Sequence, residues 1–135
     1  MVIGSNCWTS DPVRSRLEVM TRTPKEVAAT YFEAWKSKDF DTLASILHED
    51  ATFRGPLGTA ANGAECVAGL KGMSEIVTDI DITHVFVDGP NVLTWFDLHT
   101  SIASPASTAN WQRIEDGTIR EIRVTFDPRE ITAAG

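Results

Sequence analysis

The sequence NWQRIEDGTIREIRVTF, residues 110–126, decides the fold class. Apolar and polar residues alternate on both sides of Asp116-Gly117, and this dipeptide between two alternating runs is typical of a tight β-hairpin. The apolar residues of the second run lie two positions apart on one side of the strand and are Ile122, Val124 and Phe126. We therefore predict two antiparallel strands whose apolar face covers a core.

Further strand patterns lead into this hairpin. Alternate positions at residues 79–86 are expected to share one face, with Ile80, Ile82, His84 and Phe86 on one side and Asp79, Asp81 and Thr83 on the other. The Asp-Gly-Pro-Asn turn at residues 88–91 then leads to an apolar strand at residues 92–102. A looser link at residues 103–107 then joins the first strand of the hairpin. Because strands connected by short turns pair antiparallel, the second half of the chain predicts an antiparallel sheet.

Three helices are predicted in the first half of the chain. Thr23 is followed by proline and then, three residues after it, by Glu26, which is the pattern of a capping box with proline at the first helical position. Asp39 is positioned to cap a second, shorter helix. Asn62 is positioned to cap a third helix that we expect from about residue 63 to residue 77.

The chain is expected to form a single domain. Residues 1–22 have no sustained periodicity and predict a flexible N-terminal extension. The domain itself is expected over residues 23–131, followed by a tail at residues 132–135. Helices that precede a set of hairpin-connected strands make the fold class α+β, with the N-terminal helices packed against the sheet.

Composition excludes several kinds of partner. A net charge of −7 argues against binding to nucleic acid or to an anionic membrane surface, since both need a basic face. No apolar run approaches the roughly 20 residues of a membrane span. Cys7 and Cys66 lack the spacing of a zinc site or a disulfide framework, so no metal is predicted. We expect a cytoplasmic protein.

Four phrases resemble the nuclear transport factor 2-like superfamily, which includes SnoaL-like polyketide cyclases, ketosteroid isomerases and limonene-epoxide hydrolases. They are YFEAWKSKD at residues 31–39, LHEDATF at 47–53, GPLG at 55–58 and GTIREIRVTFD at 117–127. The resemblance implies that the curved sheet forms an open cone, that helices close its narrow side, and that a pocket lies within. It also implies chemistry without a cofactor and a homodimer that forms through the outer face of the sheet.

The resemblance carries over only part of the known catalytic machinery. Tyr31 matches the oxyanion-binding tyrosine of ketosteroid isomerases, and Asn110 matches their second hydrogen-bond donor. The position of the isomerase base is occupied by Gly55. The position of the acidic residue on the last strand of cyclases and epoxide hydrolases is occupied by Val124. The resemblance therefore implies hydrogen-bond donors without the central carboxylates.

One further pair of residues could supply acid–base chemistry. Asp97 and His99 are two positions apart, so they share one face of a strand with Leu93 and Trp95. If that face is inward, a histidine oriented by an aspartate makes a general acid–base pair. If it is outward, the two are ordinary surface groups. Both faces of residues 92–100 are apolar, so periodicity leaves the choice open.

Two functions follow, of different classes. The first is cofactor-independent acid–base catalysis on a small hydrophobic molecule that bears a carbonyl, with Tyr31, Asn110, Asp97 and His99 as catalytic residues. The second is a non-catalytic small-molecule-binding or dimeric interaction module. In both, the remaining residues expected to line the pocket are Trp35, Phe53, Leu70, Met73, His84, Gln112, Ile122, Val124 and Phe126.

Overall fold

A computed structural model describes residues 22–134, in which helices and strands alternate in the first half and hairpins dominate the second. All but one residue of the expected N-terminal extension therefore lie outside the described residues. In chain order the elements are α3 (Pro24–Ser37), α4 (Phe40–Ile46), β1 (Leu47–Gly55), β2 (Gly58–Ala60), α5 (Gly63–Met73), β3 (Val77–Asp88), β4 (Asn91–Thr100), β5 (Ala106–Glu115), β6 (Thr118–Thr125) and α6 (Arg129–Ala134).

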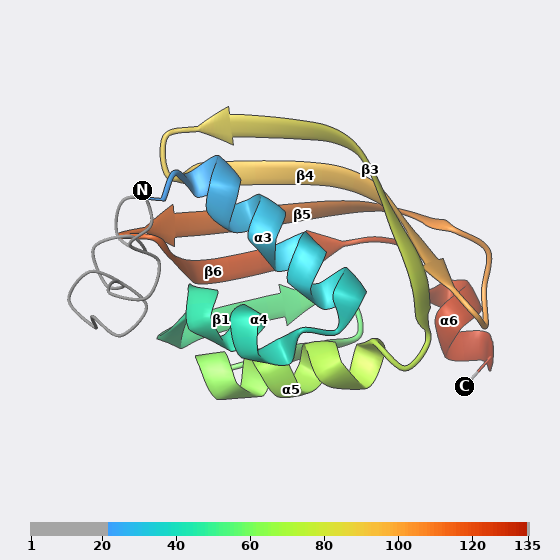
Figure 1. Ribbon diagram of the computed structural model, residues 1–135. Helices are drawn as coiled ribbons and strands as arrows, with labels where there is room; N and C mark the ends of the chain where they lie inside the picture. Colours follow the sequence, from blue (N-terminus) through green and yellow to red (C-terminus); the bar gives the residue numbers. More distant parts are fainter. Residues whose placement is uncertain (1–21, 135) are drawn as a thin grey trace, which may run out of the picture.

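The strands form one curved, unclosed sheet with the order β2-β1-β6-β5-β4-β3. The helices α3, α4 and α5 lie on its concave side, and α6 lies at one end (Figure 1). This arrangement confirms the predicted α+β class with helices packed on a curved sheet. The expectation that every pair is antiparallel is wrong at one place, because β1 pairs with β6 in parallel. The two strands are not joined by a hairpin, so no short turn constrains their direction.

The three predicted helix starts are confirmed by their caps. Thr23 accepts a hydrogen bond from the backbone N–H of Glu26 at 3.2 Å, and the Glu26 carboxylate accepts one from the backbone N–H of Thr23 at 2.8 Å. Asp39 and Asn62 accept equivalent bonds at the starts of α4 and α5. The third helix is shorter than predicted, since Val77 already belongs to β3.

The predicted hairpin between β5 and β6 is also confirmed. Asp116 and Gly117 adopt φ angles of 53° and 75°, the left-handed conformations that a two-residue hairpin turn of the right twist requires. On the inner face of β6, Ile122 is fully buried and packs in the main core under α3. The alternation of the sequence therefore assigns the faces of this strand correctly.

A β-bulge in β3 changes which residues face inward. Ile82 pairs with Phe96 on the inner face of β4, but His84 pairs with Trp95 on the outer face, because the register shifts between residues 82 and 84. An extra residue in a strand reverses the facing of everything after it. The expectation that residues 80, 82, 84 and 86 share one face is therefore wrong beyond the bulge.

The C-terminal segment forms a helix that the sequence analysis does not predict. Residues 132–134 of the expected tail belong to α6, which buries Ile131. The Glu130 carboxylate accepts hydrogen bonds from the backbone N–H of Ser104 at 3.2 Å and from its hydroxyl at 2.9 Å. These contacts fasten the link between β4 and β5. None of the helices within residues 22–134 is long and apolar enough to cross a membrane.

Candidate functional site

A cavity of about 450 Å³ lies between the concave face of the sheet and the helices α3 and α5. Its walls come from both helices, from β1 and β2, from the inner faces of β4, β5 and β6, and from the loop between β1 and β2. Six residues that the sequence analysis expects in a pocket line it, and they are Trp35, Phe53, Leu70, Met73, Val124 and Phe126. The cavity wall is mainly apolar.

A buried hydrogen bond sets the position of α5 at the cavity. The Trp35 indole N–H donates to the Leu70 carbonyl oxygen at 3.0 Å, and both side chains line the cavity. At the other end of the helix, Gly63 approaches β1 so closely that a Cβ atom built on it would lie 2.5 Å from the His48 carbonyl oxygen. The distance between α5 and the rest of the fold is thus set by the Trp35 hydrogen bond near one end of the helix and by the missing side chain of Gly63 at the other.

Tyr31 and Asn110 lie together at the buried end of the cavity, as the resemblance implies. Tyr31 comes from α3 and is 1% exposed; Asn110 comes from β5 and is 2% exposed. Burial is the main reason that the pKa of Tyr31 is raised, the nearby Cys66 adds to the increase, and the Asn110 side chain opposes it by hydrogen bonding. The phenol is therefore neutral at physiological pH and keeps a proton to donate.

Besides Thr59, three further polar residues line the cavity that were not expected there from the sequence. Cys66 is buried, and its thiol donates to the Ala51 carbonyl oxygen at 3.6 Å. Burial, followed by the charge of Glu65, raises the pKa of Cys66 to about 11, so the thiolate is scarce at neutral pH. The other two are Thr108 and Glu65 itself. Cys66 and Leu70 stand four residues apart on the buried stripe of α5, a spacing that is visible in the sequence.

Two predicted pocket residues lie on the inner face but do not border the cavity. Ile122 is fully buried beneath it, and Gln112 is 1% exposed. Neither polar atom of the Gln112 side chain has a hydrogen-bond partner among residues 22–134, and neither has Asn110 Oδ1. Such buried, unpaired polar atoms are unusual in folded proteins.

The expectation that His84 lines the pocket is wrong, and of the two faces left open for Asp97 and His99 the structure has the outer one. Asp97 and His99 alternate with Phe96 and Leu98, whose side chains are buried on the inner face, so the pair lies on the outer face of β4. His84 lies beyond the bulge, exposed, and its ring stacks on Phe86 with centroids 6.1 Å apart. None of the three lines the cavity.

At the two cavity positions where the resemblance would place a carboxylate, this chain has a glycine and a valine. Gly55 and Val124 both line the cavity. A Cβ atom built on Gly55 would lie 3.0 Å from Cε1 of Phe53, so the phenyl ring fills the space next to this glycine. Among residues 22–134, no group of three or more histidine, cysteine, aspartate or glutamate side chains could hold a metal ion.

Comparison with known proteins identifies the family. The family model described as the SnoaL-like domain matches residues 28–122, which is more than half of the chain. The chain belongs to the SnoaL-like domain family. No curated protein matches its sequence.

Solved structures agree on the fold of this SnoaL-like protein. An NTF2-like protein of unknown function from Cytophaga hutchinsonii has 21% sequence identity and a TM-score of 0.74, covering 82% of this chain and 95% of its own. An LEH-like epoxide hydrolase from M. tuberculosis has 21% identity and a TM-score of 0.69, with coverage of 82% and 87%. A putative SnoaL-like polyketide cyclase from Shewanella denitrificans has 17% identity and a TM-score of 0.68, with coverage of 82% and 95%. The resemblance is therefore confirmed at the level of the SnoaL-like family and of the fold.

Proposed function

We propose that this SnoaL-like protein binds a small, uncharged hydrophobic molecule whose carbonyl oxygen accepts a hydrogen bond from Tyr31. The observation that carries this proposal is the neutral Tyr31 phenol beside Asn110 at the buried end of a mainly apolar cavity. A donor fixed in an apolar surrounding binds a carbonyl strongly, because water does not compete for it. The apolar walls then bury the rest of the ligand.

The distribution of charge favours an uncharged ligand. Among residues 22–134, Glu65 is the only acidic or basic residue that lines the cavity, and it is exposed on the first turn of α5. One of its oxygens accepts a hydrogen bond from the Ala61 backbone N–H at 2.9 Å. The part of the cavity wall that the structure describes therefore offers an anionic ligand no cationic side chain, and nothing would offset the free-energy cost of removing the ligand's charge from water.

The probe prodan, a neutral fluorescent naphthyl ketone, tests this proposal. We expect it to bind with an affinity that is constant between about pH 5 and pH 8, because no group that contacts it titrates there. Gly69 lines the cavity, and a Cβ atom built on it meets nothing within 4 Å, so Gly69→Phe should fill the cavity and abolish binding. Ala68→Phe is the matched control, since Ala68 is exposed on the same helix and does not line the cavity. Equal binding by both variants would refute the proposal.

Catalysis by proton transfer is the second candidate function, and the carboxylate of Glu65 at the cavity favours it. A carboxylate near the carbon next to a carbonyl held by Tyr31 could act as a general base. Such an activity would exchange the α-protons of bound prodan for deuterium in heavy water, and mass spectrometry would detect the exchange. Loss of exchange in Glu65→Gln with unchanged prodan affinity would establish the role. Exchange no faster than in buffer would leave binding as the function.

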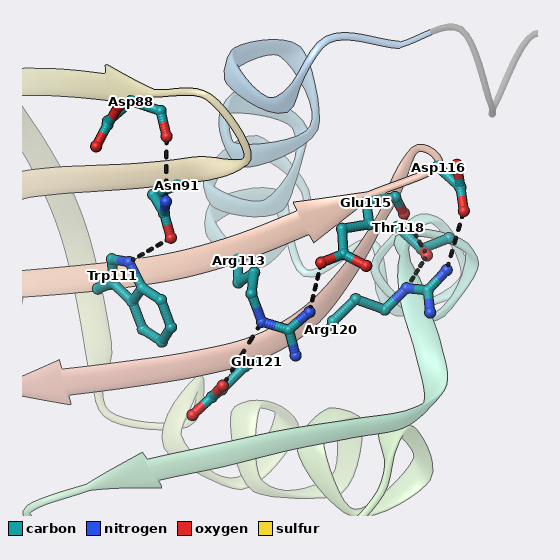
Figure 2. A network of polar contacts seen from close by, with 9 residues as sticks. All are labelled: Asp88, Asn91, Trp111, Arg113, Glu115, Asp116, Thr118, Arg120 and Glu121. Carbon is teal, nitrogen blue, oxygen red and sulfur yellow. Dashed lines mark hydrogen bonds and ion pairs between the residues drawn. The ribbon is translucent and has the colours of Figure 1, made fainter.

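We also propose that the protein forms a homodimer through the outer face of the sheet. Phe86 and Trp95 are 59% and 43% exposed there, and Leu93 is 38% exposed. At one end of this face, Figure 2 shows a polar network in which Arg113 contacts carboxylates on both β5 and β6. Large exposed apolar side chains bordered by polar groups are typical of protein interfaces.

Sedimentation equilibrium tests the dimer. Trp95→Glu should place a charge in the interface and produce a monomer. Ile102→Glu is the matched control, because Ile102 is comparably exposed, at 38%, but lies in the loop after β4. A wild-type protein that sediments as a monomer at high micromolar concentration would contradict this proposal.

A further inference from the structure

We propose that Gln112 is a positioning residue, which holds the Asn110 amide so that Tyr31 directs its own O–H into the cavity. This role rests on the proposed function, since it concerns how the carbonyl-binding donor is oriented. Gln112 itself does not line the cavity, so it would act through Asn110 rather than on the ligand.

Both amides lie on the inner face of β5, two residues apart. Residues at this spacing point to the same side of a strand, roughly 7 Å apart along it. Asn110 pairs across the sheet with Thr94 and Val124, and Gln112 pairs with Val92 and Ile122. Three of these four neighbours have no polar side-chain atom. The nearest polar side chain for Gln112 on its own strand face is therefore Asn110.

The unpaired atoms of the two amides are complementary. Asn110 Oδ1 can only accept a hydrogen bond and Gln112 Nε2 can only donate one, and both are buried without a partner among residues 22–134. Leaving such an atom unpaired costs roughly 1–3 kcal/mol. A hydrogen bond between them, direct or through one bridging water, would satisfy both atoms. Of the three unpaired atoms of the two amides, this hydrogen bond would leave only Gln112 Oε1 without a partner.

The pairing fixes which end of Asn110 faces Tyr31. When Oδ1 accepts from Gln112, the amide nitrogen is the end that remains for Tyr31, and it donates to the phenol oxygen. The direction in which Asn110 affects Tyr31 agrees, since a donor to the phenol oxygen lowers its pKa. The Tyr31 proton is then free for a ligand carbonyl. If the Asn110 amide were turned over, its oxygen would accept a hydrogen bond from the Tyr31 hydroxyl, and that hydroxyl could then no longer donate to a ligand.

Prodan emission reports this donor directly, because hydrogen bonding to its carbonyl shifts the emission to longer wavelength. Tyr31→Phe should weaken prodan binding roughly three- to tenfold, the effect of one lost hydrogen bond, and shift the bound emission to shorter wavelength. Gln112→Met, which keeps the length of the side chain without its amide, should produce the same two changes without touching the probe.

Ile114→Val is the matched control. Ile114 follows Gln112 by two residues, is 2% exposed and does not line the cavity, so this substitution disturbs the packing of the same strand without removing a polar atom. This variant should keep the wild-type emission. Gln112→Glu gives a second signature that loss of packing alone would not produce. Its protonated acid can donate to Asn110 and its carboxylate cannot, so its bound emission should change with pH while that of the wild type does not.

The outcomes separate the positioning role from the proposed function. Wild-type emission and affinity in Gln112→Met, together with a shifted Tyr31→Phe, would overturn the role of Gln112 and leave carbonyl binding by Tyr31 intact. A pH-independent, wild-type emission in Gln112→Glu would overturn it as well, even if Gln112→Met does not fold. Unchanged binding and emission in Tyr31→Phe would overturn both.

Discussion

The indole N–H of Trp35 donates to the carbonyl oxygen of Leu70 over 3.0 Å, so a side chain of α3 holds the backbone of α5. The same carbonyl also accepts from the backbone N–H of Ser74 at 2.9 Å, where α5 ends. Because Trp35 and Leu70 both line the cavity, one contact contributes to the stability of the fold and to the shape of the site.

Removal of this hydrogen bond should destabilise the protein measurably. Trp35→Phe loses the donor and part of a buried ring, so we expect the free energy of unfolding to fall by about 1–3 kcal/mol. Urea denaturation measures this change. Ile102→Ala is the control, since Ile102 is 38% exposed in the loop after β4 and lies outside the proposed dimer interface, and it should change the free energy of unfolding by less than about 0.5 kcal/mol. Equal effects of the two substitutions would contradict the structural role of Trp35.

Two glycines of α5 should respond to alanine in opposite directions. Gly69→Ala adds a Cβ atom that meets nothing within 4 Å, so the higher helix propensity of alanine should stabilise the protein by roughly 0.5–1 kcal/mol. Gly63→Ala would place a Cβ atom 2.5 Å from the His48 carbonyl oxygen and should destabilise by about 1–3 kcal/mol. Thermal or urea unfolding of both variants tests the close approach of α5 to β1. A neutral Gly63→Ala would show that α5 can move away from β1 at little cost.

Tyr31 should make the fold sensitive to alkali. The phenol of the unfolded chain titrates near its ordinary pKa of 10.0, whereas burial raises the pKa of folded Tyr31. Above pH 10 the unfolded state therefore binds fewer protons, and stability falls as pH rises, with a limiting slope of about 1.4 kcal/mol per pH unit. Tyr31→Phe should lack this component. The pKa of Cys66 is also raised, so Cys66 makes stability fall with rising pH in both the wild type and Tyr31→Phe. The difference in pH dependence between the two proteins therefore isolates the contribution of Tyr31.

This alkaline transition has a direct optical readout, because Tyr31 is the only tyrosine in the chain. The ultraviolet absorbance of the phenolate should appear together with the loss of folded structure, followed by circular dichroism. Ionisation of the phenol near pH 10 in a protein that is still folded would contradict the burial of Tyr31.

The outer-face position of Asp97 and His99 predicts that neither affects the cavity. Asp97→Ala and His99→Ala should bind prodan with wild-type affinity and emission, both at about pH 5 and at about pH 8. Fluorescence titration measures both quantities. A change of more than about threefold in affinity would indicate that the outer face is coupled to the cavity.

Local sequence patterns predict much of this fold. Thr23, Asp39 and Asn62 each place an oxygen where the first backbone N–H groups of a helix need an acceptor, so each helix start is visible in the sequence. The Asp116-Gly117 turn is equally local. The end of α5 is not, because residues 74–77 could continue the helix, whereas in the structure residues 74–76 form a turn and Val77 begins β3 by pairing with Thr100 of β4.

The site is less predictable, since it depends on which face of each strand is inward. Both faces of β4 carry large apolar residues, so Trp95 and Phe96 give no indication of the facing of Asp97. In β3 the alternation of apolar and polar residues stops at Thr83, but the bulge after Ile82 that turns His84 outward is visible only in the pairing with β4. Tyr31 and Asn110 meet only in the folded protein, where α3 crosses the sheet (Figure 1).

The parallel pairing of β1 with β6 has a consequence for the order of folding. β1 ends at Gly55 and β6 begins at Thr118, so this contact must close a long loop of chain. Closing long loops before the contacts form is a principal reason that some topologies fold slowly. During synthesis, β1 would have left the ribosome well before its partner strand existed. Until β6 arrives, the apolar residues of β1 and α5 have no sheet to cover them, and in that interval the chain is most exposed to aggregation.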